Sequence, residues 1–235
     1  MAQVEVCFSP QLFSLYDVKS ANVVVVDVLR ATSAICAAFE NGVESIIPVP
    51  DVYLALEYRS QGYLAAAERN GKVVPGFDFG NSPFAFMQEN LKGEKIVLTT
   101  TNGTKAIEIA KKAKAVLIGS FLNLGALVKH LTGQNEDVVV LCAGWKDRYC
   151  IEDALFAGAL AQGLVDNGFD VNCDSANIMM KSWAQAKDDL NEYLMDCSHR
   201  KRLGGMDLTK DVEFCLTVNQ STKIPVLKDD ALVLL

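Results

Sequence analysis

The stretch VVVVDVLRAT, residues 23–32, places three polar side chains directly after a strongly apolar run. Four consecutive valines predict a strand that is buried on both faces, as in a parallel sheet. Asp27, Arg30 and Thr32 follow without a break, and a helix-like run then continues to Gly42. This order of strand, polar loop and helix is typical of α/β folds, in which the carboxyl ends of strands present functional side chains.

The rest of the chain alternates short β-rich runs with helix-like segments, which predicts a layered α/β/α fold with a mostly parallel or mixed sheet. The predicted strands span residues 4–8, 23–28, 45–49, 64–67, 95–99, 115–119 and 138–142. After Gly168 the pattern changes and predicts one long amphipathic helix over residues 175–194, then a helical piece interrupted at Gly204. We interpret residues 1–235 as a single compact α/β domain or two closely packed α/β halves.

Composition favours a protein with a large core and reduced thiols. The chain has 235 residues, 50% of them hydrophobic, and needs neither disulfides nor a structural metal to fold. The seven cysteines are an odd number without a C-x-x-C pair, so we expect neither disulfides nor zinc. The N-terminus lacks signal-peptide features and the apolar runs are strand-length, so we expect a cytoplasmic location and no membrane partner.

The charge balance limits the ligands to consider. A formal net charge of −7 opposes general nucleic-acid binding, which needs a basic surface. The one basic cluster, HRKR at residues 199–202, is interpreted as the solvated end of a helix. A small anionic ligand must therefore be bound by a few individually placed basic side chains.

Four polar clusters come at or just after predicted strand ends, where loops lead into helix N-termini that favour anions. They are DVLRAT (27–32), ERNGKVVPGFDFGNSP (68–83), TTTNGT (99–104) and CAGWKDRYCIED (142–153). The first and third resemble each other, because residues 27–34 and 99–106 each run from a strand end into Thr-x-Ala. Two such matches are weak evidence of an internal duplication.

Several of these residues suit the binding of a phosphate or sulfonate. Arg30 is placed to hold an anion bidentately, although an ordinary ion pair with Asp27 is the alternative. Asn102 and Gly103 form a turn that exposes backbone donors, unless this is a tight strand-to-helix turn without a ligand. The predicted substrate-binding residues are Arg30, Thr32, Ser33, Arg69, Asn81, Ser82, Thr101, Asn102, Gly103, Thr104 and Arg148.

Carboxylates at the strand ends indicate a hard cation. The predicted metal ligands are Asp27, Glu68, Asp78, Glu152 and Asp153. Oxygen ligands favour Mg²⁺ over zinc, and the chain has only two histidines, His130 and His199, which we interpret as structural or surface residues. The alternative for Glu152 and Asp153 is that they complement the dipole of the helix that they begin.

This set of residues predicts transfer of a phosphoryl group to water, with Asp27, Arg30 and Asp153 as the catalytic residues. The haloacid-dehalogenase pattern is excluded, because Leu29 stands where that pattern needs a second Asp. A cysteine-nucleophile phosphatase stays open, since Cys142 and Arg148 have the Cys-x5-Arg spacing. A non-catalytic anion-binding module is a further alternative; it would bind phosphate compounds without the carboxylates.

Five ordered motifs resemble the 2-phosphosulfolactate phosphatase family of coenzyme M biosynthesis. They are VVVVDVLRATSAICAAFENG, ERNGKVVPGFDFGNSP, VLTTTNGTKAI, VLIGSFLNL and CAGWKDRYCIEDALFAGAL, and together they cover about residues 4–168. The resemblance implies an α/β fold and Mg²⁺-dependent hydrolysis of 2-phospho-3-sulfolactate to 3-sulfolactate and phosphate. Arg69, Lys146 or Arg148 would then remain for the sulfonate and carboxylate of the substrate.

The chain departs from the family pattern in two places. Ala66-Ala67 stand where the family often has a Gly before Glu-Arg, and the stretch after Gly168 matches weakly. Because the family also occurs where no coenzyme M pathway is expected, another small phosphorylated hydroxy acid is an alternative substrate. The expected partner is thus a small anionic phosphoester, with homo-oligomer formation left open.

Overall fold

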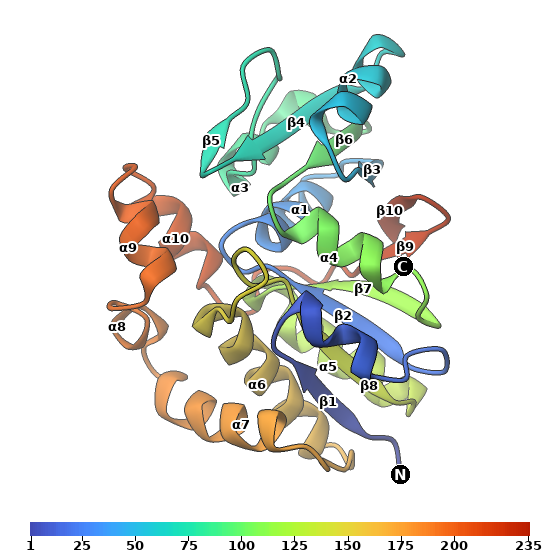
Figure 1. Ribbon diagram of the computed structural model, residues 1–235, viewed down its shortest axis with the longest axis vertical. Coiled ribbons are helices and arrows are strands. Elements are labelled where there is room, and N and C mark those ends of the chain that lie inside the picture. Colours follow the sequence, from blue (N-terminus) through green and yellow to red (C-terminus); the bar gives the residue numbers. More distant parts are fainter.

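The computed structural model describes residues 1–235, which form one ten-stranded sheet covered by helices on both faces (Figure 1). The strand order is β1-β8-β2-β7-β9-β10-β3-β6-β4-β5. The strands are β1 (Val4–Cys7), β2 (Asn22–Val26), β3 (Ser45–Pro48), β4 (Leu64–Arg69), β5 (Lys72–Val73), β6 (Lys95–Thr99), β7 (Ala115–Gly119), β8 (Val138–Cys142), β9 (Pro225–Lys228) and β10 (Ala231–Leu234). The predicted α/β class and all seven predicted strands are confirmed.

The helices include three short 3-10 segments. In chain order they are η1 (Pro10–Leu15), α1 (Ala31–Glu40), α2 (Val52–Ser60), α3 (Pro83–Phe86), η2 (Glu89–Leu91), α4 (Gly103–Ala110), η3 (Phe121–Asn123), α5 (Leu124–Gln134), α6 (Ile151–Val165), α7 (Asp174–Ala186), α8 (Leu190–Tyr193), α9 (Ser198–Gly204) and α10 (Thr209–Cys215). None of them combines the length and the apolar character needed to cross a membrane.

The sheet consists of two parallel blocks joined by the C-terminal hairpin. Strands β1, β8, β2 and β7 are parallel to one another, and so are β3, β6 and β4. The hairpin β9–β10 lies between the blocks and pairs antiparallel with β7 on one side and β3 on the other. Three successive antiparallel pairings make the two blocks run in opposite directions, a feature that the sequence analysis did not predict.

Two helical crossovers connect these blocks. Strand β2 leads through α1 to β3, and β6 leads through α4 back to β7. The two blocks are paired in the same way: the strand that begins one crossover lies beside the strand that ends the other, β2 beside β7 and β6 beside β3. The two crossovers begin with the stretches that resemble each other in sequence, residues 27–34 and 99–106. The repeated motif therefore marks equivalent places in the two halves of the sheet.

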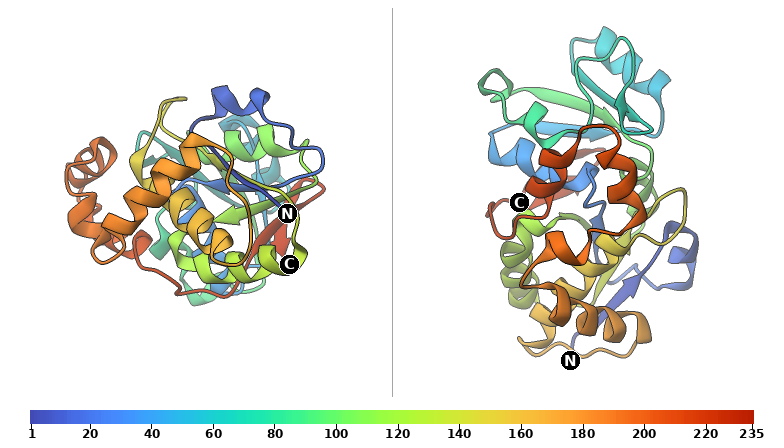
Figure 2. Two further views of the ribbon diagram at one scale, coloured as in Figure 1. Left: turned by 90° about the horizontal axis from the view of Figure 1, so that it is seen from below. Right: turned by 90° about the vertical axis from the view of Figure 1, so that its left-hand side faces the viewer.

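The last quarter of the chain folds into four helices rather than one long helix and a second piece. Helix α7 ends at Ala186, and Asp189 starts α8 by accepting a hydrogen bond from the Glu192 N–H. The predicted helix over residues 175–194 was therefore wrong: the side chain of Asp189 satisfies backbone donors of a new helix instead of continuing the old one. Helices α8–α10 group on one side of the molecule, with α9 and α10 beside the junction of the two blocks (Figures 1 and 2).

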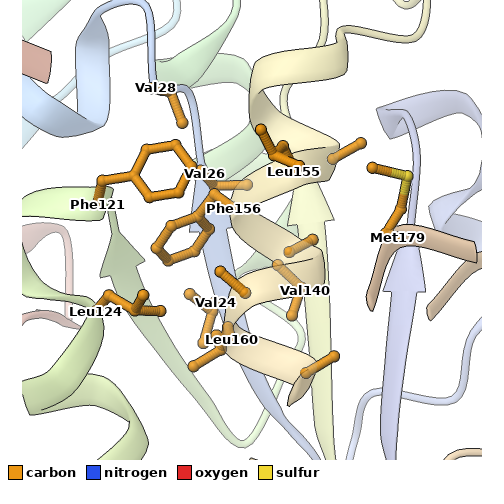
Figure 3. Packing of buried hydrophobic residues seen from close by; sticks show 14 of the residues in the cluster. Val24, Val26, Val28, Phe121, Leu124, Val140, Leu155, Phe156, Leu160 and Met179 are labelled. Carbon is orange, nitrogen blue, oxygen red and sulfur yellow. The ribbon is translucent and has the colours of Figure 1, made fainter. Parts of the chain in front are cut away.

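The four valines of β2 explain how the layers are held together. Val24 and Val26 belong to a core shared with α5, α6 and α7, whereas Val23 and Val25 belong to a second core shared with α1 and α4. In the first core Phe156 of α6 packs against β2 and meets Phe121 edge-on, with ring centroids 5.6 Å apart (Figure 3). Because side chains alternate along a strand, one apolar run supplies both layers.

A glycine contact between α6 and α7 tests this packing. A Cβ added to Gly158 would lie 2.2 Å from the carbonyl oxygen of Met179, whereas one added to Gly133 of α5 meets nothing within 4 Å. We expect Gly158→Ala to lower the free energy of unfolding by about 1–3 kcal/mol, and Gly133→Ala to raise it by about 0.5–1 kcal/mol. Urea unfolding measures both; equal shifts in the same direction would contradict the tight α6–α7 contact.

Candidate active site

Segments from both blocks meet in one small polar pocket at the carboxyl ends of the strands. Its walls come from the loop after β2, the end of β4, the loops that start α3 and α4, the loop after β8, and α9. The polar side chains lining it are Asp27, Arg30, Glu68, Asn81, Asn102, His199 and Arg202. The pocket contains residues of all four polar clusters that the sequence analysis identified at strand ends, and also residues of α9, which it did not expect there.

Asp153 ties two of these loops together. Its Oδ1 accepts a hydrogen bond from the Val28 N–H at 2.8 Å, and its Oδ2 accepts one from the Gly144 N–H at 2.9 Å. Asp153 is buried, so burial together with Glu152 and Asp27 raises its pKa well above the usual range. The carboxylate is therefore fixed between the segments that follow β2 and β8.

Asp27 lies beside Asp153 at the end of β2. Its backbone N–H donates to Thr32 Oγ1 at 2.9 Å, which shapes the loop into α1. Burial, opposed by His199 and reinforced by Glu68, raises the pKa of Asp27 to about 6. A carboxyl group with a pKa near neutrality can both accept and release a proton under ordinary conditions.

Glu152 leaves one oxygen without a partner. Its Oε1 lies 2.5 Å from His199 Nδ1, while its buried Oε2 has no hydrogen-bond partner. The Cys150 sulfur is close as well, because donor atoms of Cys150, Glu152 and His199 all lie within 4.8 Å of one another. Burial, together with Asp153 and Glu152, raises the pKa of Cys150 far above its usual range, so this thiol is neutral.

Glu68 organises the facing side of the pocket. It accepts hydrogen bonds from the Gly71 N–H at 2.5 Å and from Thr101, whose hydroxyl donates to Oε2 at 3.2 Å. The carboxylate at the end of β4 therefore holds the β4–β5 turn against the loop after β6.

Arg30 is bound by the protein's own groups. Its guanidinium pairs with Asp211 of α10 and also donates to the Gly71 carbonyl at 3.2 Å. Both groups of the Arg30–Asp211 pair are buried, and they join residues 181 positions apart. The ion pair of Arg30 is therefore with Asp211 and not with Asp27, the partner that the sequence analysis considered as the alternative to anion binding. Arg30 still lines the pocket.

Most of the hydroxyls predicted to bind substrate shape loops instead. Thr32 accepts from the backbone of Asp27, Ser33 donates to the Val28 carbonyl at 2.8 Å, and Thr104 bonds to Thr100. Their oxygens are buried, or in the case of Thr101 committed to Glu68, and none of these residues lines the pocket. Local hydrogen bonding between a loop hydroxyl and nearby backbone is the physical reason.

Gly103 permits the close approach of the two crossover helices. A Cβ at this position would lie 2.6 Å from the Ala31 Cβ and 2.9 Å from Asp27 Oδ2. Gly103 is thus required for packing against Asp27, and it begins α4 itself, while Thr104 is inside the helix and not its cap.

Four further predicted residues lie outside the pocket. Asp78 accepts from the Ala65 N–H and pairs with Arg59 at 3.2 Å. Asp78 is therefore held at Ala65, three residues or about 10 Å along β4 before Glu68, and it does not line the pocket. Arg69 donates to Thr99 Oγ1, and Ser82 and Arg148 do not line the pocket. The prediction that Asp78 binds the metal was therefore wrong.

The cysteine-nucleophile alternative is also contradicted. Cys142 is fully buried within the apolar core, and burial together with Asp153 raises its pKa well above the usual range. Arg148 is exposed on the following turn. A neutral thiol without solvent access cannot act as the attacking group.

Two pocket residues come from a segment that the sequence analysis interpreted as a solvated helix end. His199 and Arg202 of α9 line the pocket, whereas Lys201 between them is exposed and pairs with Asp196. The interpretation of residues 199–202 as a solvated helix end was therefore wrong for His199 and Arg202, whereas a structural role for His199 agrees with its burial and its contact with Glu152. The spacing was the available signal, because residues i and i+3 lie on the same face of a helix.

The donor set fits a hard divalent cation. Five carboxylates are buried in or beside the pocket, while its cationic groups are Arg30, Arg202 and, when protonated, His199. The carboxylates are Asp27, Glu68, Glu152, Asp153 and Asp211. Buried carboxylates in excess of their cationic partners are costly unless a cation balances them. Glu152 Oε2 and Asn81 Oδ1, both buried without partners, are the oxygens available to such an ion.

Comparison with known proteins identifies the family of the chain. The family model described as 2-phosphosulpholactate phosphatase matches residues 7–230. Proteins named "Probable 2-phosphosulfolactate phosphatase" are similar over most of their length: that of Thermotoga petrophila is 39% identical over 217 residues, covering 92% of this chain and 93% of its own. That of Caldanaerobacter subterraneus is 36% identical over 220 residues, covering 91% and 90%. The chain belongs to the 2-phosphosulpholactate phosphatase family.

Proposed function

We propose that the protein hydrolyses 2-phospho-3-sulfolactate to 3-sulfolactate and phosphate in a Mg²⁺-dependent reaction. The observation that carries this proposal is the cluster of buried carboxylates at the strand ends, in which Glu152 Oε2 has no partner. Its setting suits phosphoryl transfer, since such sites combine hard cations with positively charged side chains around the transferred group. Family membership supplies the substrate, which the pocket residues alone do not specify.

Glu152 Oε2 and Asn81 Oδ1 would hold the cation, with Asp27 and Asp153 beside them. Bound Mg²⁺ would supply positive charge to the phosphoryl oxygens. Asp153 is already oriented by the Val28 and Gly144 N–H groups, so its carboxylate needs little reorganisation. His199 holds Glu152 in place through its Nδ1 contact.

Asp27 is assigned to proton transfer. In the proposed reaction a water oxygen forms a bond to phosphorus while the bond from phosphorus to the ester oxygen breaks. Asp27 accepts the proton of the attacking water and then releases it to solvent, while the departing alkoxide takes up a proton from solvent to become the hydroxyl group of 3-sulfolactate. The pKa of Asp27, raised to about 6, is close to neutral pH, which suits a group that must accept a proton and later release it.

Removal of the metal tests the proposed cofactor. Protein treated exhaustively with EDTA is expected to release no phosphate above background, because the carboxylates alone repel an anionic substrate. Added Mg²⁺ should restore activity and also raise the unfolding temperature, since an ion that binds only the folded state stabilises it. Phosphate release and thermal unfolding measure the two effects; full turnover without metal would rule out this mechanism.

The assignment of Asp27 is tested by a matched pair of variants. Asp27→Asn keeps the shape of the side chain but cannot accept the proton, so kcat should fall by about 10²–10⁴-fold. Asp78→Asn removes a carboxylate that pairs with Arg59 outside the pocket and should keep kcat within about twofold, because exposed ion pairs contribute little. Equal losses in both variants would contradict the assignment.

The buried thiol provides a test against covalent catalysis by cysteine. Cys142→Ala is expected to retain most activity, with some loss of stability from the small cavity created in the core. Steady-state phosphate release at a temperature well below the unfolding midpoint separates the two effects. An inactive but folded Cys142→Ala protein would require a nucleophilic role for this residue.

A further inference from the structure

Helix α9 brings one guanidinium into the pocket in an unusual setting. The Arg202 guanidinium carbon lies 3.5 Å from the centroid of the Trp145 ring, in the loop after β8. Stacking on an aromatic ring uses the face of a guanidinium and leaves its N–H groups, which lie in its plane, free to donate. Arg202 Nη2 is buried and has no hydrogen-bond partner. The side chain is thus positioned, but its donors are unused.

The other basic side chains near the pocket are already engaged or exposed. Arg30 is paired with Asp211, and Arg69 donates to Thr99. Lys146 is exposed, with its Nζ 5.3 Å from the Trp145 centroid. A buried guanidinium donor without a partner is costly, and an anionic ligand would satisfy it. Arg202 is therefore the basic residue whose donors are available to a ligand.

Arg202 shares the pocket with the carboxylates of Asp27 and Glu68 and lies on the side formed by α9 and the loop after β8. It stacks on Trp145, the Trp145 ring lies 5.7 Å from that of His199, and His199 contacts Glu152. In 2-phospho-3-sulfolactate the carboxylate is C1, the phosphate is attached through oxygen to C2, and the sulfonate is attached to C3. A substrate whose phosphate lies at the proposed cation site therefore has its sulfonate within the same small pocket as the Arg202 guanidinium.

We propose that Arg202 binds the sulfonate of the substrate and makes the site selective for sulfonated phosphoesters, an inference that rests on the proposed function. A sulfonate is ionised at every pH of interest and offers coplanar pairs of oxygens that match the guanidinium fork. Trp145 holds the guanidinium in place, so little side-chain freedom is lost on binding. Arg202 is a specificity-determining residue and takes no part in breaking the ester bond.

Substrate pairs test this assignment. We expect Arg202→Gln to lower kcat/KM for 2-phospho-3-sulfolactate by about 10- to 100-fold, and to leave kcat/KM for 2-phospholactate, which lacks the sulfonate, unchanged. Lys201→Gln removes one charge from the outer face of the same helix and should change neither value. Equal losses for both substrates, or no loss for either, would overturn the proposal.

Ligand binding provides a readout that does not depend on turnover. The chain contains two tryptophans, so a Trp183→Phe background leaves Trp145 as the single reporter beside Arg202. Titration with 3-sulfolactate should change Trp145 fluorescence saturably, and Arg202→Gln should weaken that binding by a similar factor. Unchanged affinity would overturn the proposal. Absence of phosphate release from both esters, with 3-sulfolactate binding still dependent on Arg202, would reject the proposed reaction alone.

The variant Arg202→Lys distinguishes the loss of a ligand-binding group from a loss of folded structure. It keeps the positive charge but loses the fork, so it should recover part of the affinity for 3-sulfolactate relative to Arg202→Gln. Thermal unfolding of each variant identifies any loss of fold. If Arg202→Lys is fully folded and binds 3-sulfolactate no better than Arg202→Gln, the charge contributes nothing and the proposal fails.

Discussion

The close approach of α1 and α4 beside Asp27 is the constraint on which the rest of the structure depends. The crossovers that follow β2 and β6 both begin at the pocket, which Asp27 of the first and Asn102 of the second line. Ala31 and Gly103 face each other there, with no room for a larger side chain at Gly103. This packing places the N-terminal ends of two helices next to a carboxylate, which brings the strand ends of both blocks to one pocket.

Contacts between different segments of the chain provide hydrogen-bond and ion-pair partners for the buried charged groups. Asp153 accepts two backbone N–H groups, Glu68 accepts from Gly71 and Thr101, and Arg30 pairs with Asp211. Each contact joins different loops, so folding the loops together satisfies carboxylates that would otherwise be buried alone. Glu152 is the exception, since only one of its oxygens is satisfied. The polar network is therefore complete except where a cation and a ligand are proposed to bind.

The last quarter of the chain completes both the sheet and the pocket. Its hairpin β9–β10 joins the two blocks, and its helices supply His199, Arg202 and Asp211. Asp27 and Glu68 lie at strand ends and Glu152 and Asp153 in the first turn of α6, whereas Arg202 lies on the short helix α9. This division suits the proposed function, in which the sheet and α6 hold the carboxylates and an added segment sets substrate preference.

The sequence by itself determined the elements whose signals are local. Apolar runs of strand length predicted seven strands, and the polar residues after them included Asp27, Glu68, Glu152 and Asp153, because a strand and the loop that follows it are neighbours in the chain. The hairpin β9–β10 also has a local signal, because two apolar runs flank Asp229-Asp230. No local signal indicates that this hairpin lies between the two blocks.

Only the tertiary structure decided which polar groups face the pocket. Thr32, Ser33 and Thr104 resemble ligand-binding hydroxyls in sequence, yet they bond to nearby backbone, and Asp78 pairs with Arg59. Arg30 meets Asp211 across 181 positions of chain. The physical reason is that hydrophobic periodicity and capping act over a few residues, whereas the partner of a buried charge is chosen by packing between segments that are distant in sequence.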